Sequence, residues 1–341
     1  MTDEIDDLIR GDLATDLREK RLRAELDGQK KLAASYAKHI DRLEAALGLR
    51  DALLSAELPT IVARPASDKR RRATAVLLCS DWHVEEQVKA SKVVGRNEYH
   101  PGIAAVRAAE LARAFSWLVA HHRASWDIDE AVIWLGGDII SGYIHDELRE
   151  TNAMSPIEAT LFAQDLIDGL LAEALAIPGM RRIVVPCSYG NHGRTTHKPQ
   201  VSTGAENSYE WGMYQTLRRR WAVDPRVEFV VADGEHVYLD IYRWTFRFTH
   251  GDSVRYAGGT GGITIPLNKA VARWQTIKHA DVTCLGHYHQ YHDLPGIVVN
   301  GSLVGYGPYG LRVAAPYEDP RQAFFLVDSE HGKVQSTPVW V

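Results

Sequence analysis

The sequence lacks long apolar runs, paired cysteines and an excess of basic charge. No stretch approaches the roughly 20 apolar residues of a membrane span, and the acidic N-terminus has no apolar signal segment. The three cysteines, Cys79, Cys187 and Cys284, form no CxxC pair, so neither a zinc ribbon nor a disulfide framework is implied. The formal net charge of −5 argues against a strongly basic nucleic-acid coat but allows a local basic patch. A cytoplasmic protein with buried, reduced thiols and no membrane contact is expected.

The length and composition indicate a folded protein with more than one part. With 45% apolar and 24% charged residues, the composition is that of a globular protein. At 341 residues the chain exceeds what one compact core usually needs, so either insertions or an appendage are expected.

An apolar heptad seam runs along the N-terminal segment, residues 1–57. Its members are Leu22, Leu26, Ala33, Tyr36, Ile40, Leu43, Leu47 and Leu54, with Gln29 and Arg50 as polar breaks. Alternating steps of four and three predict a long helix that pairs with a copy of itself as a coiled coil. The alternatives are a helix packed on its own domain and an oligomer larger than a dimer.

Residues 58–72 are expected to form a linker. Pro59, Pro65 and the basic run Lys69-Arg70-Arg71-Arg72 separate the helical segment from the remainder, residues 73–341. The basic run is either a solvated face or a contact for a phosphate backbone.

From residue 73 onward, short apolar runs alternate with helical patterns, which is typical of an α/β fold. Strands are expected at 73–80, 131–135, 183–187 and 227–231, and helices at 103–122, from Pro156, and at 206–220. The second half is richer in strands and favours an antiparallel sheet, with a hairpin over 236–250, a helix near 265–279, strands within 281–286 and 296–303, and a final strand pair at 323–329 and 333–341. Two packed mixed β-sheets flanked by helices are therefore expected.

Polar clusters follow five of the expected strands. They are Asp81-Trp82-His83, Gly136-Gly137-Asp138, Gly190-Asn191-His192, His250-Gly251-Asp252 and His287-Tyr288-His289. Because ligands gather beyond the carboxyl ends of strands in open α/β sheets, these clusters are expected to meet in one cleft.

The residue types in these clusters favour a pair of metal ions. Carboxylate, imidazole and amide ligands without thiolate suit divalent Mn, Fe, Zn or Ni, of which we favour Mn. Asp138, between glycines and an apolar strand end, is the natural carboxylate to bridge two cations about 3.5 to 4 Å apart.

The five motifs together resemble those of the calcineurin-like metallophosphoesterase superfamily. Its series runs D-x-H, G-D, G-N-H, H and G-H-x-H, and the matching segments here span residues 81 to 289, with NGS at 300–302 as a further similar feature. The resemblance covers nearly the whole chain after the linker. It implies an α/β/β/α sandwich and a dinuclear site that hydrolyses phosphoric esters with a metal-activated hydroxide.

The resemblance also implies a role for each matched residue. The first metal would be held by Asp81, His83 and His289, the second by Asn191, His250 and His287, with Asp138 bridging both. His192 would be no ligand, but would contact the scissile phosphate and protonate the leaving group.

One departure from the family pattern concerns His192. Related sequences commonly continue GNH with Asp or Glu, a carboxylate that orients the histidine, whereas Gly193 follows here. Asp146 or Glu147 is a candidate replacement through space, and the alternative is that these two residues only cap or solvate a helix.

Basic side chains near the motifs are candidate substrate contacts. Arg194, His197 and Lys198 directly follow GNHG and suit additional phosphates of a larger substrate, and His145 is a further candidate. The glycine-rich stretch 256–262 lacks the order of a P-loop and is expected to be a flexible connection or a lid.

The leading hypothesis is a metal-dependent phosphodiesterase acting on DNA, because GNHGR and HGD resemble exonuclease-like proteins of bacteria and phages. A phosphoesterase for small nucleotides or phosphomonoesters is the alternative. The third hypothesis is a non-catalytic metal-binding scaffold, against which the full ligand set argues, since a scaffold does not need so much unpaired charge in one cleft.

Overall fold

The computed structural model describes residues 2–55, 70–255 and 262–341. The chain divides into two compact units, Met1–Ala66 and Ser67–Val341. Most of the expected linker 58–72 lies outside the described residues. Strand β1 begins at Arg71, so the linker prediction extended two residues too far: the last two arginines of the basic run belong to the sheet.

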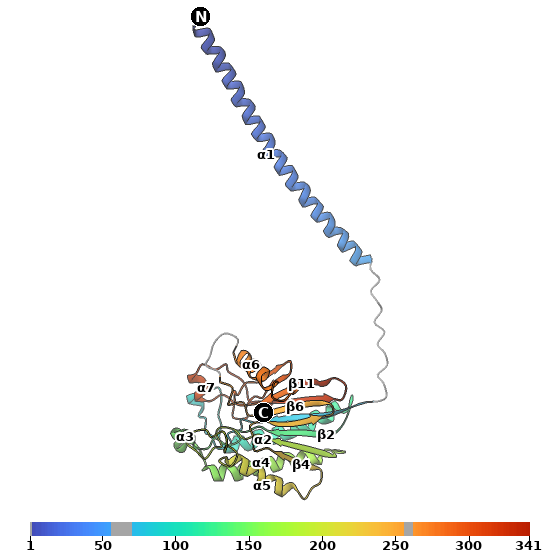
Figure 1. Cartoon of the computed structure of the whole chain (residues 1–341), viewed down its shortest axis with the longest axis vertical. Coiled ribbons are helices and arrows are strands. Elements are labelled where there is room, and N and C mark those ends of the chain that lie inside the picture. The colour runs from blue at the N-terminus through green and yellow to red at the C-terminus, as the bar shows by residue number, and fades with distance from the viewer. Residues whose placement is uncertain (1, 56–69, 256–261) are drawn as a thin grey trace. The chain divides into compact units, whose positions relative to one another are not determined.

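The described residues of the first unit form one long helix, α1, Thr2–Ser55 (Figure 1). The long N-terminal helix predicted from the heptad seam is therefore confirmed. Its described side chains, from 16 to 48, are all exposed. Ion pairs one turn apart, Lys20 with Asp16 and Arg23 with Glu19, add local support to the helix.

The second unit contains a six-stranded sheet in the order β11-β10-β1-β2-β3-β4. Its strands are β1 (Arg71–Cys79), β2 (Trp126–Leu135), β3 (Arg182–Cys187), β4 (Val227–Val231), β10 (Arg321–Asp328) and β11 (Gly332–Trp340). The first four are parallel, whereas β10 returns antiparallel beside β1. The final strand pair therefore belongs to the first sheet, and assigning it to the second half's sheet was wrong.

A five-stranded sheet has the order β5-β6-β7-β9-β8. Its strands are β5 (Val237–Ile241), β6 (Trp244–Thr249), β7 (Val282–Leu285), β8 (His292–Leu294) and β9 (Ile297–Val299). The central pairs β6–β7 and β7–β9 are parallel and only the outer pairs are antiparallel. The expected antiparallel character is wrong for the centre because helix α6, Thr264–Trp274, provides the crossover that parallel strands need.

The remaining helices are α2 (Pro101–His122), α3 (Asp146–Thr151), α4 (Pro156–Ala176), α5 (Tyr209–Trp221) and α7 (Pro308–Arg312), with a short 3₁₀ turn at Ala90–Lys92. Helix α4 begins with a capping box, in which Ser155 and Glu158 each accept from the other's backbone N–H. Helix α6 ends at Trp274, five residues before its predicted end.

The side chains of β1 alternate between two cores. Ala75 and Leu77 face a core shared with α2, α4 and α5, whereas Val76 and Leu78 face a core shared with Phe246 and other residues of the second sheet. A third core joins the second sheet to α6. In Figure 1, α5 lies below the strands of this unit and α6 lies above them. The predicted arrangement of two packed mixed sheets between helices is confirmed.

The three cysteines are buried and free, as expected from their spacing. In the part of the chain that the structure describes, no helix combines the length and the apolar character needed to cross a membrane.

Candidate metal centre

The candidate ligands lie in loops that follow β1, β2, β3, β6 and β7. Five of the residues have a left-handed backbone: Asp81 (φ 56°), His83 (φ 49°), Asp138 (φ 49°), His287 (φ 73°) and His289 (φ 54°). This conformation is costly for residues other than glycine and persists only where the surroundings enforce it. Its repetition at five ligand positions indicates a site whose geometry is imposed by the fold.

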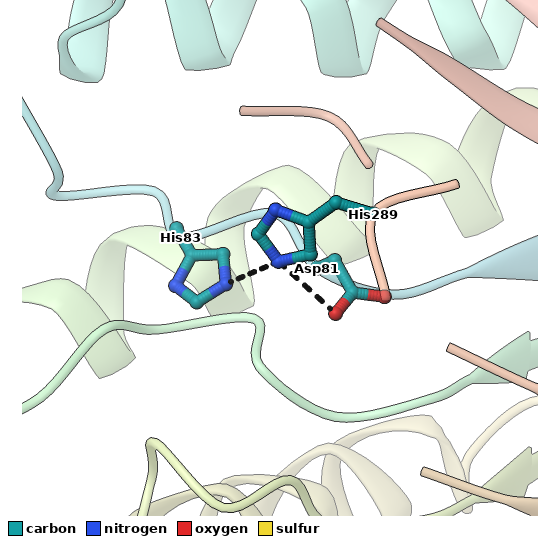
Figure 2. Close-up of side chains that lie close together, drawn as sticks. All are labelled: Asp81, His83 and His289. Carbon is teal, nitrogen blue, oxygen red and sulfur yellow. Dashed lines mark hydrogen bonds and ion pairs between the residues drawn. The ribbon is translucent and has the colours of Figure 1, made fainter. Parts of the chain in front are cut away.

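A first group consists of Asp81, His83 and His289 (Figure 2). His289 lies between the other two, with its Nε2 3.3 Å from Nε2 of His83 and 3.4 Å from Oδ1 of Asp81. Asp81 and His83 are buried, and His289 is half-buried. The ligand atoms of the group all lie within 4.8 Å of one another, so a single cation could contact all three.

A second group consists of Asp138, His250 and His287. Nε2 of His250 lies 3.0 Å from Oδ2 of Asp138 and 3.2 Å from Oδ1 of Asn191. The amide oxygen of Asn191 therefore joins the group as a fourth donor.

The two groups are direct neighbours. The backbone N–H of His287, from the second group, donates to both carboxylate oxygens of Asp81, from the first, at 2.9 and 3.1 Å. The structure thus brings all seven ligands predicted from the sequence into one cluster.

Hydrogen bonds on the outer side of two imidazoles fix their orientation. Nδ1 of His83 bonds to the hydroxyl of Ser141 at 2.9 Å, and Nδ1 of His250 bonds to the carbonyl of Gly136 at 2.8 Å. In both rings Nε2 is left facing the cluster. Metal-binding histidines are held in this way in proteins.

The electrostatics of the cluster depend on Asp138. Burial lowers the pKa of His83, and the neighbouring His192 and His289 lower it further. Burial also acts to lower the pKa of His250, but the adjacent Asp138 carboxylate outweighs it and raises the pKa well above its ordinary value. For Asp138 itself, burial opposes ionisation, yet His250 and His192 hold its pKa well below the usual range.

The donor set fits divalent cations. The cluster combines carboxylate, imidazole and amide donors, and none of its members is a thiolate. Burial of His287 lowers its pKa to about 4, so this ring is neutral and able to donate a lone pair at neutral pH.

Comparisons with known proteins were made by sequence and by structure. Neither a scan against protein-family models nor a search of curated proteins finds a match. A search of solved structures finds Vps29 of Entamoeba histolytica complexed with zinc, at 14% identity, covering 78% of this chain and 99% of that chain with a TM-score of 0.32. It also finds a hypothetical protein of Pyrococcus horikoshii OT3, at 14% identity, covering 78% and 88% of the two chains with a TM-score of 0.38.

A third solved structure is a conserved uncharacterised protein of Streptococcus pneumoniae TIGR4, described as a predicted phosphoesterase. It is 11% identical, and the match covers 78% of this chain and 98% of that chain with a TM-score of 0.29. In the present chain, two mixed sheets lie between helices, and the five motifs meet at the ends of their strands. This is the arrangement expected from the resemblance of the five motifs to those of calcineurin-like metallophosphoesterases.

His192 is held from two sides. Its backbone N–H donates to Oδ1 of Asp138 at 2.8 Å, and its Nδ1 lies 3.0 Å from the carbonyl of Ser141. Its ring packs edge-on against His83, with centroids 4.8 Å apart. Since a carbonyl only accepts, Nδ1 carries a proton and Nε2 is the atom left for a substrate.

The carboxylate expected to orient His192 is not Asp146 or Glu147. Both are exposed in the first turn of α3, and neither bonds to His192 in the described structure. The reason is that the carbonyl of Ser141 already accepts from this ring. His145, just before α3, does approach His192, with ring centroids 6.1 Å apart.

Two buried glutamates, Glu85 and Glu210, support the site and were missed in the sequence. Glu210 accepts from the backbone N–H of Ile139 at 2.6 Å and of Gly190 at 2.7 Å, and Glu85 accepts from Ser141 at 2.9 Å. Burial raises the pKa of each carboxyl to about 7. Their sequence surroundings give no sign of burial, although Glu85 follows His83 by only two residues.

The substrate contacts predicted on the loop after GNH differ in their surroundings. The Arg194 guanidinium donates to the carbonyls of Asn191 at 2.9 Å and Thr196 at 3.1 Å, so it braces its own loop. The role of Arg194 in substrate binding stays a prediction. Lys198 is exposed. The glycine-rich stretch falls outside the described residues except for Gly262.

Proposed function

We propose that this protein is a dinuclear metal-dependent phosphodiesterase that cleaves DNA. The proposal is supported by two neighbouring ligand groups and by His192, whose backbone N–H donates to Asp138, the carboxylate of the second group. Two divalent cations in this site would activate water and neutralise the oxygens of a phosphoryl group.

The residues of this chain supply the remaining parts of the reaction. Asp138 lies in the second group and its charge acts on His83 of the first, which suits a carboxylate shared by two cations. His192 donates Nδ1–H to the Ser141 carbonyl, so in the doubly protonated ring Nε2–H would give its proton to the departing oxygen of an ester and leave a neutral imidazole. No covalent bond between the chain and the phosphoryl group is needed.

Two features support DNA as the substrate. His197 and Lys198 are exposed on the loop that also contains Asn191 and His192, where they could contact phosphates on either side of the scissile bond. The resemblance of GNHGR and HGD to exonuclease-like proteins points the same way. Mn is the metal we propose for the native site.

The test is Mn-dependent hydrolysis of three substrates: bis(p-nitrophenyl) phosphate, p-nitrophenyl phosphate and an end-labelled DNA strand. The full chain is compared with Asp138→Asn and with Asp127→Asn, an exposed aspartate of strand β2 that serves as the matched control. We expect the unchanged chain and Asp127→Asn to cleave the diester and the DNA, and Asp138→Asn to cleave neither.

Other outcomes would redirect or reject the proposal. Diester hydrolysis with intact DNA would reject the DNA assignment in favour of a small nucleotide. Silence on all three substrates despite bound Mn would reject catalysis and favour a scaffold.

A further inference from the structure

The loop after Asp138 is held by two buried carboxylates that come from distant parts of the chain. Glu210, in α5, accepts from Ile139 at 2.6 Å and from Ile140 at 3.3 Å. Glu85, after β1, accepts from Ser141 at 2.9 Å and from Gly142 at 2.8 Å. Four consecutive backbone N–H groups, 139 to 142, are therefore paired with only two side chains.

Glu210 also bonds to the second ligand loop. Its other oxygen, Oε2, accepts from the backbone N–H of Gly190 at 2.7 Å, immediately before Asn191. One carboxylate thus joins the loop that holds Asp138 to the loop that holds Asn191. The side chain is fully buried.

The two loops are already in close contact where Glu210 joins them. A Cβ atom on Gly190 would lie 2.2 Å from Oδ1 of Asp138, and one on Gly137 would lie 2.3 Å from the nitrogen of Gly190. Because the loops touch through backbone atoms, a small shift of either loop would displace ligand atoms directly.

We propose that Glu210 is a positioning residue that sets the spacing between Asp138 and Asn191, and thereby the metal affinity of the site. An amide in its place could accept at one atom only, whereas the carboxylate accepts at both oxygens. The inference rests on the proposed metal site. It does not depend on catalysis, because metal binding is measured separately.

A glutamate substituted at Gly193 could place a carboxylate at the same point from the neighbouring loop. A Cβ atom on Gly193 would lie 2.7 Å from Cγ and 2.9 Å from the carboxyl carbon of Glu210. Two C–C bonds of about 1.5 Å at a tetrahedral angle span roughly 2.5 Å, so a glutamate at 193 brings its carboxyl carbon close to this position, whereas the shorter aspartate does not. A glutamate at 193 could therefore place its carboxylate where that of Glu210 now lies, but only if Glu210 is removed.

The experiment measures Mn binding by calorimetry and thermal unfolding of the full chain. We expect Glu210→Ala and Glu210→Gln to weaken Mn binding by about 10- to 100-fold. Gly193→Glu alone is expected to weaken it too, since the two side chains collide. The double variant Gly193→Glu/Glu210→Ala is expected to recover most of the affinity. Glu206→Ala, which removes an exposed glutamate shortly before α5, is the control.

Recovery of Mn affinity in the double variant tests the positioning role of Glu210 even if a single variant is less stable. Unchanged Mn affinity in both Glu210 variants would overturn the proposal. A double variant no better than Glu210→Ala would also overturn it, because the carboxylate would then act through something other than its position. If the unchanged protein binds Mn but hydrolyses nothing, the proposed function fails and this test can still be read.

The exposed seam of α1 carries a second inference, independent of the active site. The a positions of the heptads hold Leu26, Ala33, Ile40 and Leu47. The d positions hold Leu22, Gln29, Tyr36 and Leu43. The six large apolar members are between 49% and 61% exposed. A stripe of this length, formed by the same residues on an identical helix, matches a second copy without a shift in register.

Charges beside the seam indicate the direction of pairing. In a parallel pair, Glu25 at g faces Lys30 at e of the partner helix, and the imidazole N–H of His39 at g can donate to Glu44 at e. Arg18 and Arg23 face each other near the N-terminal end and oppose the pairing there. We infer that α1 forms a parallel two-stranded coiled coil with a second copy of this chain.

The oligomeric state of the full chain, measured by sedimentation, tests this inference. We expect a dimer that becomes a monomer in Ile40→Lys/Leu43→Lys, whereas Ala45→Lys, which adds positive charge off the seam, stays dimeric. Leu22→Cys should form an interchain disulfide on oxidation, because parallel helices bring this position together. A monomeric chain, a larger oligomer, or a dimer that Leu22→Cys fails to cross-link would overturn the inference.

Discussion

The backbone N–H of His192 donates to Oδ1 of Asp138 at 2.8 Å. The candidate acid and the candidate bridging carboxylate are thus joined through a main-chain atom. A change of the Asp138 side chain is therefore expected to disturb both the metals and His192. Truncation of the His192 side chain leaves the bond intact, so the two substitutions should have different effects.

Asp138→Asn is expected to lose bound metal and activity while the fold survives. The amide keeps the volume of the carboxylate but removes the negative charge that acts on His250 of the second group and on His83 of the first. We expect Mn affinity and turnover to fall by at least about 100-fold. Calorimetry measures the affinity, and circular dichroism checks the fold. Full occupancy of two Mn ions in this variant would contradict the assignment.

His192→Ala is expected to keep two metals and lose rate. Its ring is bonded to the Ser141 carbonyl and lies outside both ligand groups. Loss of a general acid costs about 10²- to 10⁴-fold, and most for substrates with poor leaving groups. Turnover of alkyl diesters, which have poor leaving groups, should therefore fall more than turnover of nitrophenyl diesters. Equal losses on both substrates would argue against proton transfer by this ring.

Much of the site could be predicted because each ligand directly follows a buried strand. Asp81, Asp138 and Asn191 come after the parallel strands β1, β2 and β3, whose carboxyl ends share one edge of the sheet. That argument needs only strand ends and their order, both of which are visible as apolar runs. The matching edge of the second sheet supplies the histidines after β6 and β7.

The supporting residues could not be predicted because their roles depend on distant partners. Glu210 sits in the first turn of α5, where an acidic residue is usually solvated and interacts with the helix dipole. Only the packing of α5 against the ligand loops buries it. The pairing of β10 with β1 in the first sheet could not be predicted either. An apolar strand can pair with either sheet, and its own sequence does not indicate which one.

Arg194→Ala and Lys198→Ala are expected to differ although they lie on one loop. Arg194 donates to the carbonyl of the predicted ligand Asn191, so its loss should weaken Mn binding and slow every substrate. Lys198 is exposed, so its loss should weaken DNA binding alone and reduce the slope of log affinity against log salt by about one. Small diesters serve as the control. Slower hydrolysis of small diesters by Lys198→Ala would contradict this division.

His236→Phe is expected to reduce the loss of stability in acid. Burial, together with the Arg247 guanidinium, lowers the pKa of His236 to about 4, and the ring packs edge-on against Trp274 with centroids 4.6 Å apart. The ordinary pKa is 6.5. Between these values the unfolded chain binds a proton that the folded chain does not, so the free energy of unfolding decreases as pH falls from 6.5 to 4.

Phenylalanine keeps the aromatic contact and removes this titration. Allowing for the partial exposure of the ring, we expect the free energy of unfolding of the variant to fall by about 1 kcal/mol less than that of the unchanged protein between pH 6.5 and 4. Urea unfolding of the metal-free protein at several pH values measures the difference, with His197→Phe, on an exposed loop, as the matched control. Curves for His236→Phe and the unchanged protein that run parallel from pH 6.5 to 4 would mean that this histidine does not contribute to acid unfolding.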